Sequence, residues 1–119
     1  MGWDIFETRA DRYDAWFETA RGKKIWAAEL RCLERLLPND LSGWIEVGVG
    51  TGRFAAPLGI SAGVDPAPAM LDKAKQRGIS TQESAAEKLP FKSSSLDGIL
   101  LVVTLCFVDK PEQAIHECA

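Results

Sequence analysis

The sequence predicts an α/β fold with three layers, in which helices cover both faces of a mostly parallel sheet. From residue 44 onward, short strand patterns alternate with helix patterns, which is typical of parallel strands joined by crossover helices. Residues 98–103 are apolar at consecutive positions, as expected for a strand that is covered on both faces. A glycine-rich segment, residues 48–52, lies between the first strand pattern and the helix pattern that follows it.

Composition narrows the class of protein. The chain has 119 residues, the size of one domain, and 46% of them are hydrophobic, so we expect a globular fold. The net charge of −3 argues against a broad nucleic-acid-binding surface, because phosphate affinity needs clustered positive charge. No apolar run reaches the length of about 18 residues that a membrane span needs. The first 25 residues contain five acidic side chains, unlike a signal peptide, so we expect a cytoplasmic protein.

Cysteine and histidine usage argues against a metal site. Cys32, Cys106 and Cys118 are odd in number and form no CxxC pair, which favours neither a disulfide framework nor a zinc site. His116 is the single histidine of the chain and lacks a neighbouring ligand in the sequence. We therefore expect no metal, and we expect Cys32 and Cys106 to be buried thiols.

Two amphipathic helices are expected in the N-terminal part of the chain. Apolar side chains recur at steps of three and four within residues 5–20, and the same steps recur from residue 26 to residue 37. Gly22 is expected to interrupt the first helix, and Pro38 to end the second.

The first half of the α/β part alternates strand and helix in short pieces. Residues 44–47 predict a first strand, and a very short helix over residues 53–56 follows the glycine-rich loop. Pro57 and Gly59 are expected to cut this helix off. A second strand is predicted over residues 60–65.

The second half contains the clearest signals. A helix is predicted between Pro68 at its start and Gly78 just beyond its end. Residues 79–83 predict a third, polar strand, and residues 96–105 predict the most apolar one. Asp109, with Glu three residues later, is expected to open a last helix.

The glycine-rich loop is the candidate ligand site, because ligands of open α/β sheets bind beyond the carboxyl ends of the strands. Its alternating glycines let backbone N–H groups approach a ligand, and Thr51 adds a hydroxyl. A dinucleotide fingerprint would need a further glycine at Arg53. Glu46 puts a negative charge beside the loop, which disfavours phosphate and suits a cation. Asp65, at the end of the second strand, can accept hydrogen bonds from two ribose hydroxyls. A cationic, phosphate-free riboside fits these features, which points to S-adenosylmethionine.

The same segments resemble the class I S-adenosylmethionine-dependent methyltransferases, in particular small-molecule methyltransferases of the type 11 kind. Each motif lies in the order and near the spacing typical of that family, and together the motifs span residues 5–117. The matching segments are residues 6–14 of the N-terminal helix, 46–54, 63–71, 86–91 with 95–97, and 104–109. The resemblance implies a Rossmann-like sandwich with strand order 3-2-1-4. It also implies a single S-adenosylmethionine-binding domain over residues 1–119, with a helical lid over 1–40 and the Rossmann-like half over 41–119.

The resemblance implies where the methionine end of the cofactor would lie. Glu46 would lie near its ammonium group, and Val103 and Thr104 would flank the sulfonium. Three loop glycines would line the methionine moiety, namely Gly48, Gly50 and Gly52. Glu46 has an alternative role, which is to orient the loop by accepting backbone N–H groups.

The resemblance also implies the nucleoside contacts. Asp65 would hold the ribose hydroxyls, and Pro66 and Met70 would pack on the adenine. Ala86 and Glu87 would contact the other side of the adenine. Asp65 could instead cap the following turn, and Glu87 could be a solvated loop charge.

Two further features qualify the implied site. Tyr13 would reach the methionine carboxylate or close the lid, although a residue of its type is more often part of a core. Many relatives have Asp at the position of Ala85, where its carboxylate accepts a hydrogen bond from the adenine amino group, and Ala85 cannot do this.

The resemblance leaves the last strands of the family unaccounted for. Relatives continue with a glycine turn and strands five to seven, so we expect this chain to be a C-terminal truncation. The edge of the fourth strand would then be unprotected and would invite pairing. We therefore expect a homodimer or exchanged oligomer that covers this edge.

The implied function is transfer of a methyl group from S-adenosylmethionine to a small-molecule acceptor. No residue pattern nominates a general base, so the catalytic residues stay unassigned. One alternative is a non-catalytic S-adenosylmethionine-binding fragment or split subunit that needs a partner chain. A dinucleotide-binding oxidoreductase is a third candidate, disfavoured by Arg53 and by Pro57 in the following helix.

Overall fold

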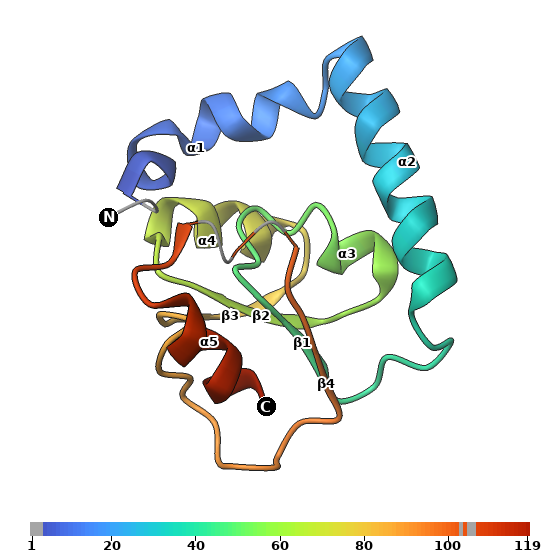
Figure 1. Ribbon diagram of the computed structural model, residues 1–119. Coiled ribbons are helices and arrows are strands. Elements are labelled where there is room, and N and C mark those ends of the chain that lie inside the picture. The colour runs from blue at the N-terminus through green and yellow to red at the C-terminus, as the bar shows by residue number, and fades with distance from the viewer. Residues whose placement is uncertain (1–3, 103, 105–106) are drawn as a thin grey trace.

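The computed structural model describes residues 4–102, 104 and 107–119 (Figure 1). Helices and strands alternate after two N-terminal helices, as the sequence patterns predicted. In chain order the elements are α1 (Asp4–Trp16), α2 (Ala20–Leu36), β1 (Trp44–Val47), α3 (Ala55–Leu58), β2 (Ala62–Asp65), α4 (Pro68–Gln76), β3 (Ser80–Glu83), β4 (Gly98–Leu100) and α5 (Pro111–Cys118).

The four strands form one parallel sheet in the order β3-β2-β1-β4, which confirms the expected order. The central strand β1 pairs with β2 on one side and with β4 on the other, so the chain reverses its winding direction beside β1. Such a reversal leaves a crevice beyond the carboxyl ends of the central strands. The glycine-rich loop follows β1 and lies at this place (Figure 1).

Separate hydrophobic clusters cover the two faces of the sheet. On one face, Ile45 and Val47 of β1 pack with Ala114 of α5. On the other face, Leu100 of β4 packs with buried residues of α3 and α4 and with part of α2. Helices therefore cover both faces, and the three-layer α/β sandwich predicted from the sequence is confirmed. Among the described residues, no helix combines the length and the apolar character required to cross a bilayer.

The N-terminal helices differ from the prediction at their junction. The first helix ends at Trp16 rather than near residue 20, and Gly22 lies inside α2. The reason is a helix cap: the Thr19 hydroxyl accepts a hydrogen bond of 3.0 Å from the Gly22 N–H and so starts α2. Within α1, Arg9 has non-helical backbone angles that kink the helix.

Three other boundaries were predicted wrongly. Pro57 lies within α3 and does not end it, because a proline in the first turn of a helix removes no intrahelical hydrogen bond. Gly59, in the left-handed conformation, is the C-cap of α3, as the sequence predicted. The strand expected over residues 96–105 is shorter and covers Gly98–Leu100. The side chain of Asp109 does not cap α5. The N-cap residue of this helix is Lys110.

Candidate functional site

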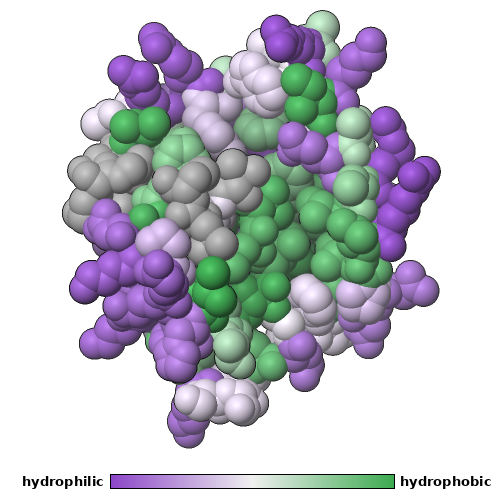
Figure 2. All heavy atoms as spheres, in the orientation of Figure 1, coloured by the Kyte–Doolittle hydropathy of each residue, from purple (hydrophilic) through white to green (hydrophobic). Residues whose placement is uncertain are grey.

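A cavity of about 610 Å³ lies at the carboxyl ends of the central strands, beneath α1 and α2. That volume lies within the range of pockets that hold small molecules and cofactors. Figure 2 shows apolar side chains gathered around a hollow on this face of the molecule, with hydrophilic side chains around the rim. The cavity therefore has an apolar body and a polar border.

Most of the residues that the sequence nominated for the cofactor line this one cavity. They come from five separate parts of the chain, which only the fold brings together. The nominated residues that line it are Tyr13, Glu46, Gly48, Gly50, Thr51, Asp65, Pro66, Met70, Ala86, Glu87 and Thr104. Two nominated residues are not in this set. Gly52 faces Ala74 of α4 and the nearby Ile79, from which an added Cβ would lie 3.4 and 3.2 Å away. Val103 lies outside the described residues, as does Cys106.

The glycine-rich loop holds its shape through contacts at both ends. The N–H groups of Gly48 and Val49 both donate to the Val64 carbonyl of β2, at 2.8 and 2.9 Å. Gly48 has a φ of +77°, and a Cβ at this position would overlap Thr104, approaching its Cγ2 to 2.6 Å. Any other residue at position 48 would therefore be strained and would displace Thr104 from the cavity wall.

Asp65 fixes the conformation of two turns at the cavity wall. Its Oδ2 accepts from the Gly50 N–H at 3.0 Å, and its Oδ1 accepts from the Ala67 N–H at 2.9 Å. The turn-capping alternative is thus present in the structure. A carboxylate oxygen can accept more than one hydrogen bond, so both oxygens retain capacity toward a ligand hydroxyl. Burial raises the pKa of Asp65, against the effect of these two N–H groups.

Glu46 is the most deeply buried carboxyl group of the cavity, with 2% of the residue exposed. Burial raises the pKa of Glu46 well above its ordinary value, a hydrogen bond from the Ala55 backbone opposes the rise, and the charge of Asp65 adds to it. Its Oε1 has no hydrogen-bond partner. An unpartnered buried acceptor is costly, and a cationic donor in the cavity would relieve that cost.

Tyr13 lies in an aromatic cluster at the α1 side of the cavity. Its ring makes edge-to-face contacts with Phe6 and Phe17, with ring centroids 5.5 and 5.3 Å apart. Burial, with the charges of Glu46, Asp65 and other carboxylates, raises the pKa of Tyr13 to about 12. The hydroxyl therefore stays protonated at neutral pH and can donate a hydrogen bond into the cavity.

Glu87 is held by α5. Its Oε2 accepts from the N–H groups of Asp109 and Lys110, each at 3.2 Å, and its carbonyl accepts from the Gln113 side chain. These contacts cap the N-terminus of α5 from a distant loop. The alternative of a freely solvated charge is therefore wrong.

Sequence reasoning missed several cavity residues. Arg53, considered in the sequence only as a position where a glycine was lacking, lines the cavity with 7% of the residue exposed. The acidic residues Asp14 and Glu18, four positions apart in the segment predicted as the first helix, were a signal for a buried cationic partner. The unpredicted lining residues include Phe6, Trp16, Phe17, Glu29, Phe54 and Phe107.

Negative charge predominates in the cavity. Among the described lining residues, Arg53 is the single cationic side chain, and its guanidinium is paired with Asp14 and Glu18. The carboxylates of the lining are those of Glu29, Glu46, Asp65, Glu87 and Asp109. Such a lining disfavours a pyrophosphate and suits a ligand with positive charge. The described residues hold no cluster of three or more side chains arranged to bind a metal ion.

Comparison with known proteins points in the same direction. Residues 45–119 match a protein family described as "Methyltransferase domain". An uncharacterized protein of Mycobacterium tuberculosis is 38% identical over 91% of this chain, and one of Methanocaldococcus jannaschii is 37% identical over 96% of it. A crystal structure from Thermotoga maritima, of an S-adenosylmethionine-dependent methyltransferase described as a possible histamine N-methyltransferase, is 42% identical over 99% of this chain, with a TM-score of 0.91.

These relatives are longer than the chain. It spans 38% of the Mycobacterium protein, 54% of the Methanocaldococcus protein and 55% of the Thermotoga chain.

Proposed function

The chain belongs to the methyltransferase-domain family, and from this premise we propose that it binds S-adenosylmethionine and serves methyl transfer to a small-molecule acceptor. The observation that carries the proposal is the unpartnered Oε1 of the buried Glu46, in a cavity whose charged lining residues are mainly carboxylates. This cofactor has an ammonium and a sulfonium group and no phosphate. Its charge thus matches the lining, whereas a dinucleotide would bring a pyrophosphate beside Glu46 and Asp65.

The residues present fit the cofactor along the whole cavity. Glu46 would accept from the ammonium group, and Asp65 would accept from the ribose hydroxyls while it holds Gly50. Met70 lies beside Gly50, where it would pack on the adenine with Pro66. In this proposal residues 1–40 act as a lid on residues 41–119.

When bound, the cofactor would supply a methyl group already activated by its positive sulfur. The tasks left to the chain are to orient the acceptor and to exclude water from the reacting atoms. The aromatic rings of Phe6, Tyr13 and Phe17 would exclude water from the α1 side of the cavity. Tyr13, whose pKa is about 12, would contribute a hydrogen-bond donor and not a base.

For the acceptor we propose a small amine. The Thermotoga relative is described as a possible histamine N-methyltransferase. In this chain, Glu29 and the ring of Trp16 both line the cavity, and a carboxylate with aromatic rings is a favourable environment for an ammonium group. Calorimetric titration of histamine into the chain loaded with S-adenosylhomocysteine tests this. Binding that weakens in Glu29→Gln is expected, and no binding to the loaded chain would rule the amine out.

The cofactor is tested by calorimetric titration of the chain with S-adenosylmethionine, S-adenosylhomocysteine and NAD. We expect the first two to bind and NAD not to bind. Loss of binding in Glu46→Gln would assign the ammonium contact. Binding of NAD alone would instead favour the dinucleotide-binding oxidoreductase.

We also propose that another strand covers β4. Within the described residues β4 pairs on one side only, with β1, and a free edge of an apolar strand invites pairing. The expected occupant is a second copy of this chain. Light scattering at micromolar concentration should then report a dimer, and a compact monomer would contradict the proposal.

A further inference from the structure

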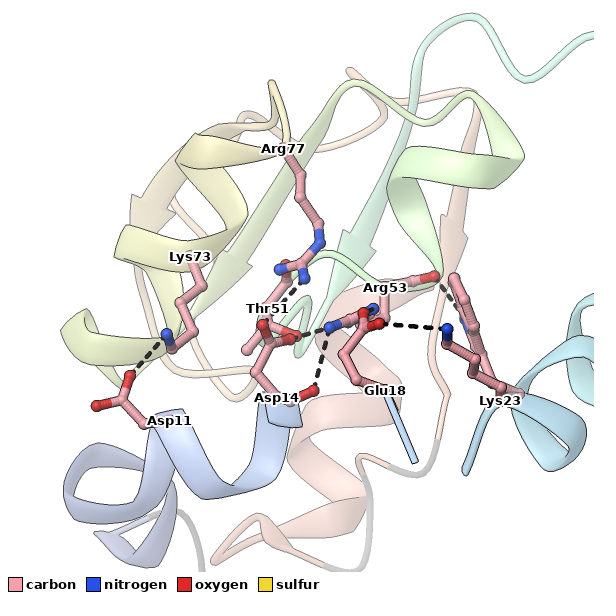
Figure 3. Close-up of polar contacts among 9 residues, drawn as sticks. Asp11, Asp14, Glu18, Lys23, Thr51, Arg53, Lys73 and Arg77 are labelled. Atoms are coloured by element: carbon pink, nitrogen blue, oxygen red, sulfur yellow. Dashed lines mark hydrogen bonds and ion pairs between the residues drawn. The ribbon is translucent and has the colours of Figure 1, made fainter. Parts of the chain in front are cut away.

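Asp14, near the end of α1, lies between two arginines from other parts of the fold (Figure 3). Its Oδ1 accepts from Arg53 Nε at 2.9 Å, and its Oδ2 accepts from an Arg77 guanidinium nitrogen, also at 2.9 Å. Its backbone carbonyl accepts a third hydrogen bond, of 3.1 Å, from Arg53. One residue of the lid is thus held through three of its oxygen atoms.

Both arginines hold the glycine-rich loop. Arg53 directly follows Gly52, the last residue of the loop, and Arg77, just beyond α4, donates to the Thr51 carbonyl at 2.9 Å. The carboxylate of Asp14 therefore joins the lid directly to Arg53 and, through Arg77, to Thr51 of the loop. A shift of α1 has to move this segment or break these hydrogen bonds.

Arg53 is enclosed by lid residues on its remaining sides. Its guanidinium stacks over the rings of Phe17 and Trp26, 5.3 and 5.5 Å from their centroids, and pairs with Glu18 at 2.7 Å. The Trp26 indole N–H donates to the Arg53 carbonyl at 2.8 Å. A buried guanidinium needs such partners, and without the lid it would lose nearly all of them.

Two other polar contacts between α1 and the rest of the fold lead to α4. Glu7 accepts from the Ala69 N–H, and Asp11 pairs with Lys73, so both tie α1 to α4 alone. The side chain of Asp11 is 97% exposed, and its ion pair is with Lys73 of α4. Asp11 is therefore a natural control for Asp14: each is an aspartate of α1 with a cationic partner on the α4 side (Figure 3).

We propose that Asp14, Arg53 and Arg77 form a latch that couples the position of the lid to the conformation of the cofactor loop, so that Asp14 is a positioning residue for cofactor binding. The effect of the latch on cofactor affinity rests on the proposed function. The attachment of α1 through Asp14 to Arg53 and Arg77 does not. The coupling is reciprocal: the free energy by which a bound cofactor stabilises the closed position of the lid equals the free energy by which the closed lid strengthens cofactor binding.

The test compares Asp14→Asn with Asp11→Asn and with the unaltered chain. In the ligand-free state, hydrogen exchange should show the α1 amides of Asp14→Asn exchanging about tenfold faster, since charge-assisted hydrogen bonds are lost, with β1 and β2 unaffected. In calorimetry, Asp14→Asn should bind S-adenosylhomocysteine about tenfold more weakly. Asp11→Asn should change either quantity by no more than about twofold.

Each outcome decides the proposal. Equal affinity of Asp14→Asn and the unaltered chain, or an equal loss in Asp11→Asn, would overturn the latch as a link to the loop. If the unaltered chain binds no S-adenosylhomocysteine, the proposed function fails. Independently of that result, unchanged exchange of the α1 amides in Asp14→Asn would show that Asp14 does not hold α1, and this would overturn the latch itself. If Asp14→Asn does not fold, Arg77→Gln serves in its place, because it leaves the Arg53–Asp14 pair and frees the Thr51 carbonyl.

Discussion

The Gly50 N–H donates a hydrogen bond of 3.0 Å to Asp65 Oδ2, so the glycine-rich loop is tied to the end of β2. A residue nominated for the ligand, with turn capping as its alternative role, thus determines the shape of the site. The other Asp65 oxygen holds the Ala67 N–H, at the start of α4. A substitution of Asp65 therefore changes the local structure of the cavity wall as well as the proposed ribose contact.

Asp65→Ala is expected to lower the stability of the ligand-free chain by about 2 kcal/mol, because two buried N–H groups lose their acceptor. It should also weaken S-adenosylmethionine binding. Urea unfolding of the ligand-free variant measures the first effect. A variant as stable as the unaltered chain would show that water or another acceptor replaces the carboxylate.

Glu46→Gln should have opposite effects on stability and on binding. The pKa of Glu46 is raised above its unfolded value, so the stability that this group contributes is present at low pH and is lost as pH rises through the folded-state pKa. The variant lacks this dependence. At pH 8 the ligand-free variant should therefore be the more stable protein, by at least about 1 kcal/mol, and at pH 4 the two should be equal.

The same variant should bind S-adenosylhomocysteine about tenfold more weakly or worse, because the ammonium group loses a charged partner. Thermal unfolding at both pH values, with and without ligand, measures both effects. A variant that is less stable at pH 8 would contradict the assignment of Glu46 as an unpaired buried acid.

Gly48→Ala is expected to destabilise the chain by about 3 kcal/mol, from a left-handed backbone and from overlap with Thr104. Gly59→Ala is a matched control, since its φ is +85° and nothing lies within 4 Å of the added Cβ. The control should cost about 1 kcal/mol. Chemical denaturation compares the two, and equal losses would mean that Thr104 moves aside freely.

Glu87→Ala should weaken the start of α5, where its carboxylate accepts from two backbone N–H groups. The expected cost is about 1 kcal/mol, typical of a lost helix cap. Hydrogen exchange of the α5 amides should rise while that of β1 stays unchanged. Glu112→Ala, within the first turn of α5, is the comparison that removes a charge without removing the cap.

Much of the fold was predictable because its signals are local. The steps of three and four in α1 and α2, and Pro68 and Gly78 around α4, depend on backbone geometry within a few residues. The junction at Thr19 was missed because Gly22 was weighed as a helix breaker, while the Thr19 cap that overrides it was overlooked. Pro57 was weighed in the same way, although its place in the first turn of α3 makes it harmless.

The cavity was predictable only as a set of nominated residues. Glu46 and Asp65 could be nominated because they lie near the carboxyl ends of parallel strands, which meet at one edge of a sheet. Thr104 was nominated through the resemblance of residues 104–109 to the methyltransferase family. Arg53 was missed because its partners, Asp14 and Glu18, are distant from it in the sequence, and no local pattern joins them.

By itself, then, the sequence determined the order of helices and strands and the chemistry offered at the ends of β1 and β2. Those features depend on backbone preferences and on side-chain type, which are properties of short segments. The tertiary structure alone decided that Oε1 of Glu46 lacks a partner, that Glu87 caps α5, and that Asp14 lies between two guanidinium groups. Burial and pairing depend on which distant segments meet, and their energies exist only once the chain has folded.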